Sequence, residues 1–138
     1  LIDTNPNLSL LNFNIVNASN YVLIPAQPAS FDLDGLAVVL QFVEGIKPYN
    51  PTLQVGGIII NRYDARNRLT REVRDEVQRC FPDHLFETVI PRNVRLSEAP
   101  SHGKSIIHYD IKSKGADAYL NLAKEVALRD PARMPQPR

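Results

Sequence analysis

Short β-branched runs alternate with longer amphipathic stretches along the whole chain, and no other property of the sequence limits its fold as strongly. This alternation predicts repeated βα units, because parallel strands need a crossover connection between them. The runs are apolar throughout, as expected of strands that helices cover on both faces. The sequence therefore predicts an α/β fold, part of a doubly wound, mostly parallel sheet flanked by helices in three layers. Its predicted strands are Leu1–Asp3, Tyr21–Pro25, Val55–Asn61 and Glu87–Pro91.

Apolar residues at helical spacing predict a helix in most of the remaining intervals. The predicted helices span Leu8–Asn17, Asp32–Gly45, Asn67–Phe81 and Gly115–Leu128, with Asp32 and Asn67 as caps. We expect the third helix to bury Leu69, Val73, Val77 and Cys80, and the last to bury Tyr119, Leu122, Ala123 and Val126. Residues 94–114 have no clear period, which predicts a long loop of functional importance. Residues 131–138 carry little apolar surface, which predicts a flexible tail.

The composition is that of one globular domain, with 138 residues of which 43% are hydrophobic. Cys80 is the single cysteine, so no intramolecular disulfide is expected, and a reducing, cytoplasmic setting fits. No apolar run is long enough to span a bilayer. All 16 basic residues lie from Lys47 onward, with 11 of the acidic ones. A mildly basic face or a mixed, solvated surface both agree with that distribution.

Polar residues stand at the carboxyl ends of three predicted strands, as Asp3, as Asn61 with Arg62, and as Pro91-Arg92-Asn93. Parallel strands bring these ends to one edge of a sheet, where ligands bind. A carboxylate there can hold Mg²⁺ near phosphates, and an Asn side chain can pair with adenine through its donor and its acceptor. Taken singly, Asp3 could instead cap the following helix, and the other two segments could be ordinary loops.

Two arginines are candidates for contact with phosphates. Most arginines between Arg62 and Arg79 alternate with acidic residues, which predicts a solvated helix face. Arg66 and Arg95 are predicted on loops with fewer acids nearby, and this favours phosphate contact. His102 and His108 have no matching nucleophile or ligand set, so we assign them no chemistry.

Three segments together resemble one family. The run from Thr88 to Val126, TVIPRNVRLSEAPSHGKSIIHYDIKSKGADAYLNLAKEV, closely resembles the end of ParA/Soj DNA-partition ATPases, which are deviant P-loop ATPases. NRYDARNRLTREVRDEV, residues 61–77, and the opening LIDTNPNLSLLN match that family in the same order. The resemblance covers the chain from Leu1 to about Arg129. It implies that residues 1–130 form the carboxy-terminal half of a ParA-like ATPase domain.

The resemblance also implies roles for single residues. Asp3 falls on the Walker B aspartate that organises Mg²⁺, and Asn61 with Pro91, Arg92 and Asn93 falls on the segments that frame adenine. Arg66 and Arg95 fall on basic positions used for sequence-independent DNA binding. The implied full-length protein is cytoplasmic and nucleoid-associated. It binds and hydrolyses ATP with Mg²⁺, forms a homodimer on non-specific DNA and is stimulated by a ParB-like partner.

Departures from the family pattern limit these expectations. Asn5 replaces the first residue of a Pro-Pro pair, and Ser9 stands where glycine is common. The 138 residues contain no GKGGxGK[ST]-like Walker A loop, so we expect this chain alone to bind no nucleotide tightly and to be inactive as an ATPase. A fragment with an exposed strand edge should aggregate or pair with a second copy. Two alternatives are a non-enzymatic DNA-binding or dimerisation remnant, and a MinD-like regulatory ATPase. The tail offers no membrane-binding helix for the second.

Overall fold

The computed structural model of the chain describes residues 1–5, 7, 9–28 and 33–129. The predicted tail and the predicted cap Asp32 lie outside the described residues. Strands β1 (Tyr21–Ala26) and β2 (Gln54–Ile60) pair in parallel, and α2 (Leu33–Ile46) lies between them in the sequence as the crossover. Within the described residues β2 is the single strand partner of β1, so the other edge of β1 is unpaired.

The predicted strand Glu87–Pro91 is an irregular extended segment beside β2 rather than a continuous strand. The amide N–H of Phe86 donates to Ile58 O at 2.9 Å, and that of Ile90 donates to Ile60 O at 2.9 Å. Residues 87–90 of this segment therefore span the same length as residues 59–60 of β2, and the two extra residues form a bulge. The bulged N–H groups of residues 87 and 88 are satisfied by a side chain from the last helix, described below.

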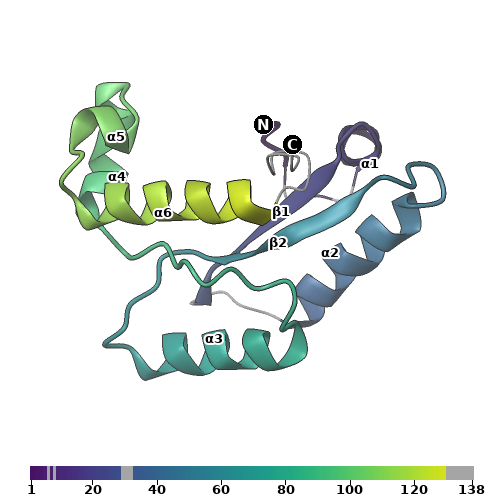
Figure 1. Ribbon diagram of the computed structural model, residues 1–138, viewed down its shortest axis with the longest axis horizontal. Coiled ribbons are helices and arrows are strands. Elements are labelled where there is room, and N and C mark those ends of the chain that lie inside the picture. Colours follow the sequence, from purple (N-terminus) through teal and green to yellow (C-terminus); the bar gives the residue numbers. More distant parts are fainter. Residues whose placement is uncertain (6, 8, 29–32, 130–138) are drawn as a thin grey trace, which may run out of the picture.

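Helices cover both faces of this sheet (Figure 1). On one face, Leu36 of α2 and Val77 of α3 (Arg68–Cys80) pack in a cluster with Ile24, Ile58 and Ile60. On the other face, α6 (Lys114–Arg129) supplies Ala118 and Leu122 to a cluster with Ile59, Phe86 and Ile90. The α/β class and the layered arrangement agree with the sequence prediction.

The first helix, α1 (Leu10–Asn17), packs at the start of the strands. Phe13 and Val16 contact a cluster that includes Val43 and Ile46 near the end of α2. Ser9 is the N-cap, and its hydroxyl accepts the N–H of Asn12 at 3.4 Å. The helix therefore begins two residues after the predicted Leu8, at a position where serine rather than the glycine common in the family provides a side-chain acceptor.

Residues 94–114 contain three short helical elements, so the prediction of one long loop is wrong. They are α4 (Val94–Glu98), η2 (Ala99–His102) and α5 (Ile106–Tyr109). Each is too short to show a helical period. Local signals set their bounds instead, because Asn93 and Ser105 cap α4 and α5 while Gly103 ends η2 in a left-handed conformation.

The predicted first strand is also wrong. Residues 1–5 form no strand, and both Leu1 and Ile2 are exposed. A strand needs a neighbour to accept its backbone hydrogen bonds, and within the described residues none pairs with this segment.

Two predicted buried stripes are shifted around their helices. In α3 the buried residues are Thr70 and Val77, whereas Leu69 and Cys80 are exposed. In α6, Leu122 is buried as expected, but Tyr119 is 43% exposed. Ala123 of α6 is exposed as well. Small residues explain the shift in α6, because Gly115, Ala116 and Ala118 allow the helix to approach its neighbours closely on a face that carries little apolar volume.

Candidate functional site

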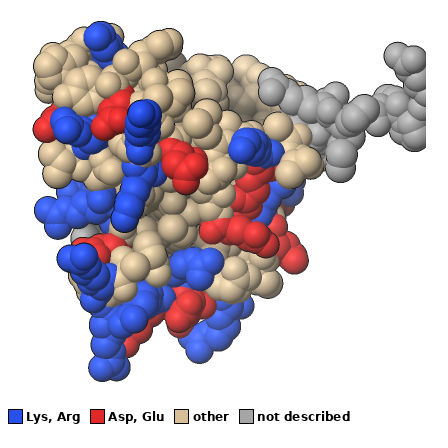
Figure 2. Space-filling model, turned by 60° about the vertical axis from the view of Figure 1, so that its left-hand side comes forward, with Lys and Arg blue, Asp and Glu red and all other residues tan. Residues whose placement is uncertain are grey.

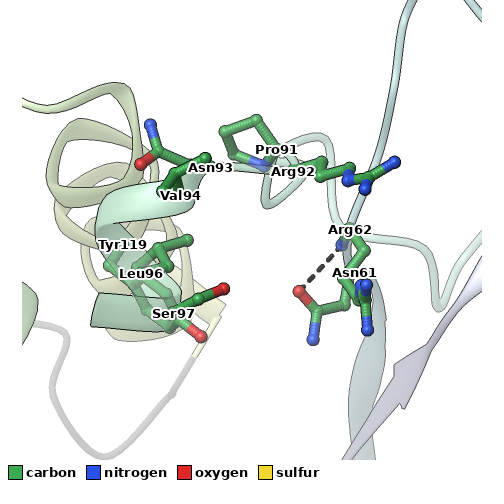
Figure 3. A pocket seen from close by; sticks show the side chains of 9 residues that line it. All are labelled: Asn61, Arg62, Pro91, Arg92, Asn93, Val94, Leu96, Ser97 and Tyr119. Carbon is green, nitrogen blue, oxygen red and sulfur yellow. Dashed lines mark hydrogen bonds between the residues drawn. The ribbon is translucent and has the colours of Figure 1, made fainter. Parts of the chain in front are cut away.

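A cavity of about 350 Å³ lies where the chain leaves β2 and where it leaves the segment beside β2. Figure 3 shows the loop residues on one side of it and the residues of α4 and α6 on the other. The lining residues are Asn61, Arg62, Pro91, Arg92, Asn93, Val94, Leu96, Ser97 and Tyr119. All four residues predicted to frame a nucleotide base, Asn61 and residues 91–93, are therefore brought together.

Backbone hydrogen bonds hold the two loops side by side. The N–H of Tyr63 donates to Ile90 O at 2.9 Å, and the N–H of Arg92 donates to Tyr63 O at 3.0 Å. Tyr63 and Pro91 form a parallel bridge. The two chain segments thus continue their parallel course past the end of β2, which is why both carry their polar residues to one rim.

The side chain of Asn61 has a fixed orientation. Its Oδ1 accepts the backbone N–H of Arg62 at 2.8 Å, the contact drawn as a dashed line in Figure 3. Arg62 has a φ of 54°, in the left-handed region that few residues other than glycine adopt. The carbonyl oxygen keeps one lone pair free, and the Nδ2 group of Asn61 remains available as a donor.

Asn93 caps a helix as well as lining the cavity. Its Oδ1 accepts the N–H of Arg95 at 2.8 Å and begins α4. The acceptor of this side chain is therefore engaged in capping, although the residue lines the cavity. By capping α4, Asn93 positions Val94 and Leu96 on the cavity wall.

The apolar wall of the cavity was missed by sequence reasoning. It consists of Val94, Leu96 and Tyr119, and Tyr119 had been expected in the core. The available signal was Gly115, where an added Cβ would lie 2.6 Å from Leu96 Cγ. Tyr119 is one helical turn after Gly115 and so faces the same side of α6, toward α4. The cavity therefore has an apolar helical side and a polar loop side.

Asp3 is not among the residues that line this cavity. It lies in the exposed segment 1–5, so the structure brings together two of the three predicted strand ends and leaves the third apart. The described residues contain no group of three acidic, His or Cys side chains able to hold a metal ion. A single carboxylate is nevertheless compatible with Mg²⁺, which takes most of its ligands from water and phosphates in nucleotide sites.

Arg95 is in a different environment from the one predicted. It lies in α4 rather than on a loop, and it pairs with Glu98 at 2.9 Å and with Asp110 at 3.5 Å. The hydrogen bond from Arg95, followed by one from the Tyr109 hydroxyl, lowers the pKa of Glu98 below its ordinary value. The sequence placed these acids three and fifteen residues away, and the turn through η2 and α5 brings Asp110 back to the arginine.

Arg66 lies on the turn before α3, as predicted, and is exposed. Its backbone N–H donates to Asp64 Oδ1 at 3.0 Å, which shapes the turn and leaves the guanidinium outside it. Figure 2 shows many Lys and Arg side chains along one side of the molecule, with fewer acidic side chains between them. The face shown in Figure 2 therefore presents basic side chains interspersed with acidic ones.

The sequence is similar to those of known proteins over most of its length. The sporulation initiation inhibitor protein Soj of Bacillus subtilis is 48% identical over 128 residues, which cover 92% of this chain and 51% of Soj. The chromosome partitioning protein ParA of Caulobacter vibrioides is 42% identical over 131 residues, which cover 94% of this chain and 49% of ParA. The chain belongs to the ParA/Soj family. This ParA/Soj-family chain spans about half the length of the relatives it matches, and it corresponds to their carboxy-terminal half.

A family model described as an AAA domain matches residues 1–55. Among solved structures, cobyrinic acid a,c-diamide synthase from Mycobacterium smegmatis superposes with a TM-score of 0.65 and 26% identity, over 86% of this chain and 41% of that one. The cell division ATPase MinD of Pyrococcus furiosus gives a TM-score of 0.63 at 22% identity, over 90% of this chain and 49% of MinD, and this likeness shows the fold alone. No described helix is long and apolar enough to cross a membrane.

Proposed function

We propose that this ParA/Soj-family chain is the part of a chromosome or plasmid partitioning ATPase that holds the nucleotide base and contacts DNA. The observation that carries the proposal is the cavity, where Asn61 and residues 91–93, far apart in sequence, line one space. Relatives that are 42–48% identical and named for chromosome partitioning or for Soj support the same function.

The cavity suits a purine base because its two sides differ. A flat heterocycle can lie against the apolar side formed by Val94, Leu96 and Tyr119. Its polar edge would then meet Asn61, whose Nδ2 group donates and whose oriented Oδ1 accepts. Base edges present both donors and acceptors, so one carboxamide can satisfy two of them.

In the full-length protein, ATP and Mg²⁺ would be the cofactors. Asp3 would supply one carboxylate to the metal, and a metal bound there would neutralise charge on the phosphates during their transfer. The side chains of this chain would hold and orient the base. The remaining phosphate contacts would come from a Walker A loop, which these 138 residues do not contain.

The proposed partners are non-specific DNA, a second copy of the protein and a ParB-like stimulating protein, in a cytoplasmic, nucleoid-associated setting. The basic side chains on the face shown in Figure 2 support contact with a polyanion. Arg66 is exposed on its turn and makes no ion pair within the described part of the chain. Arg95 is held by Glu98 and Asp110, so DNA phosphates would have to compete with both carboxylates for it.

Binding of the chain to a fluorescent, random-sequence DNA duplex tests this proposal. We expect salt-sensitive binding, and Arg66→Ala should lower the slope of log K against log salt by about one. Arg95→Ala should cost less affinity than Arg66→Ala because its charge is already paired. Lys47→Ala is the control matched to Arg95→Ala, since Lys47 is likewise paired, with Glu44, and lies just after α2 at the opposite end of the strands from the cavity. Undetectable binding at low salt would remove DNA from the proposal.

A further inference from the structure

Two guanidinium groups at the cavity rim are not neutralised by neighbouring acids. Arg62 and Arg92 both line the cavity and are exposed, and neither makes an ion pair within the described residues. Arg95, which follows shortly after Arg92, is by contrast paired with Glu98 and Asp110. Asp64, the acid that follows Arg62 most closely, uses Oδ1 to accept the N–H of Arg66. Positive charge therefore remains at the rim without a partner.

The backbone at Arg62 is unfavourable for a residue of this type. A φ of 54° is usually occupied by glycine, or by asparagine and aspartate, because a Cβ crowds the carbonyl group there. Outliers of this kind gather at ligand sites, where the surrounding structure maintains them. Here the hydrogen bond to Asn61 Oδ1 maintains it, so one strained residue fixes both the carboxamide and the direction in which its own side chain leaves the loop.

Backbone hydrogen bonds hold the two loops that carry these arginines side by side. Tyr63, on the loop that follows β2, connects it to the other loop: its N–H donates to Ile90 O at 2.9 Å, and its carbonyl oxygen accepts the N–H of Arg92 at 3.0 Å. Arg62 directly precedes Tyr63 in the sequence, and the backbone of Arg92 is hydrogen-bonded to Tyr63. Figure 3 shows both side chains on the loop side of the cavity, across from α4 and Tyr119.

From these observations we infer that Arg62 and Arg92 form an anion-binding pair at the rim, and that this chain takes a planar heterocycle whose phosphate points to that pair. The inference rests on the proposed nucleotide site and adds a phosphate contact that belongs to this chain. The heterocycle lies against Tyr119, Val94 and Leu96, while the charged group reaches the loop side. Paired arginines suit this task because each guanidinium can donate two parallel hydrogen bonds to phosphate oxygens.

Titration of the 138-residue chain with adenosine, 5′-AMP and 3′-AMP at low ionic strength, followed by NMR chemical shifts, tests the inference. We expect at least one monophosphate to bind about tenfold more tightly than adenosine, the equivalent of one hydrogen bond between charged groups. That ratio should fall toward one at high salt. It should also fall toward one in Arg62→Gln and in the Arg62→Gln, Arg92→Gln double variant. Lys47→Gln, which removes a positive charge paired with Glu44 at the opposite end of the strands, should keep the ratio.

The outcomes separate the inference from the proposed function. If adenosine binds but neither monophosphate binds more tightly, the anion pair is refuted and the base pocket stands. The same conclusion follows if the ratio is about ten in the wild type and survives in the double variant. If a monophosphate binds and adenosine does not, and the double variant loses that binding, the anion pair is supported and the base pocket is not. Absence of binding by all three ligands overturns both.

Discussion

Replacing Glu125 by alanine removes the side chain that satisfies the bulged segment beside β2. The Glu125 carboxylate accepts the N–H of Glu87 at 2.8 Å and that of Thr88 at 2.9 Å, and it pairs with Arg129 at 3.0 Å. Its own side chain is 18% exposed. Arg129 in turn donates to Leu85 O at 2.7 Å, so helix α6 supports the backbone that leads to residues 91–93.

The size of the loss follows from these contacts. The part-buried N–H of Thr88 would lose its acceptor, which costs about 1–3 kcal/mol, whereas the exposed N–H of Glu87 can bind water instead. Loss of the charged hydrogen bond with Arg129 adds to this, and we expect Glu125→Ala to lower the free energy of unfolding by about 2–4 kcal/mol. Glu125→Gln keeps one acceptor oxygen and should lose about half as much.

The effect should depend on pH. Burial acts to raise the pKa of Glu125, but hydrogen bonds from Thr88 and Glu87 and the charge of Arg129 outweigh it and lower the pKa below its ordinary value of 4.5. The unfolded chain therefore binds this proton more readily than the folded one. The stabilisation is complete above about pH 5 and is lost as the pH falls through the folded-state pKa. The difference between wild type and Glu125→Gln should shrink over that interval.

Urea unfolding followed by far-ultraviolet circular dichroism measures these differences. With a urea m-value of about 2 kcal/mol/M, a loss of 3 kcal/mol moves the midpoint by about 1.5 M. Glu87→Ala is the control, because it removes a neighbouring exposed carboxylate while its backbone N–H still donates to Glu125. It should stay within about 0.5 kcal/mol of wild type. The reasoning is refuted if Glu125→Ala behaves like this control, or if its deficit is the same at pH 4 as at pH 7.

Three glycine substitutions should change stability in different directions, and thermal or urea unfolding measures each. Gly57→Ala should lower the free energy of unfolding by more than about 3 kcal/mol, because φ is 144° and the new Cβ would lie 2.3 Å from Phe86 Cε2. A soluble variant of wild-type stability would contradict this packing at β2. Gly115→Ala should cost about 1–3 kcal/mol through its contact with Leu96 Cγ at 2.6 Å, despite the better helix propensity of alanine. Gly45→Ala, also in a helix but with no atom within 4 Å of the new Cβ, should instead raise the free energy of unfolding by about 0.5–1 kcal/mol. A loss of stability would show that helix propensity does not determine the effect at this position.

Sequence patterns located the elements that have a long period or a continuous apolar run. Tyr21–Pro25 and Val55–Asn61 differ from β1 and β2 by one residue at most at each end, and the predicted α3 includes the observed one. The failures have two causes: the helices in residues 94–114 are too short to show a period, and the buried faces of the longer helices depend on contacts that are not local. Cys80 and Leu69 fit an apolar stripe, yet the core meets α3 along Thr70, Val73 and Val77. The angle at which a helix meets the sheet cannot be obtained from its own period.

The candidate site was predictable only to the extent that it depends on topology. Parallel strands deliver their carboxyl ends to one edge, and this rule brought Asn61 and Arg92 together without knowledge of any side-chain contact. It failed for Asp3, since the rule requires a paired strand and residues 1–5 have none among the described residues. The surroundings of Arg95 and Tyr119 could not be predicted without the path of the chain from α4 to α6, and helix caps and small residues determine that path.

The position of the segment 85–91 links stability to the candidate site. Because this segment bulges by two residues relative to β2, its ladder alone would not fix where Pro91 and Arg92 emerge. Glu125 fixes the bulge from α6, the same helix that contributes Tyr119 to the apolar side of the cavity. The polar and apolar sides of the cavity are therefore positioned by one element. A change at Glu125 should consequently alter ligand binding in the cavity even where the chain remains folded, although Glu125 itself does not line it.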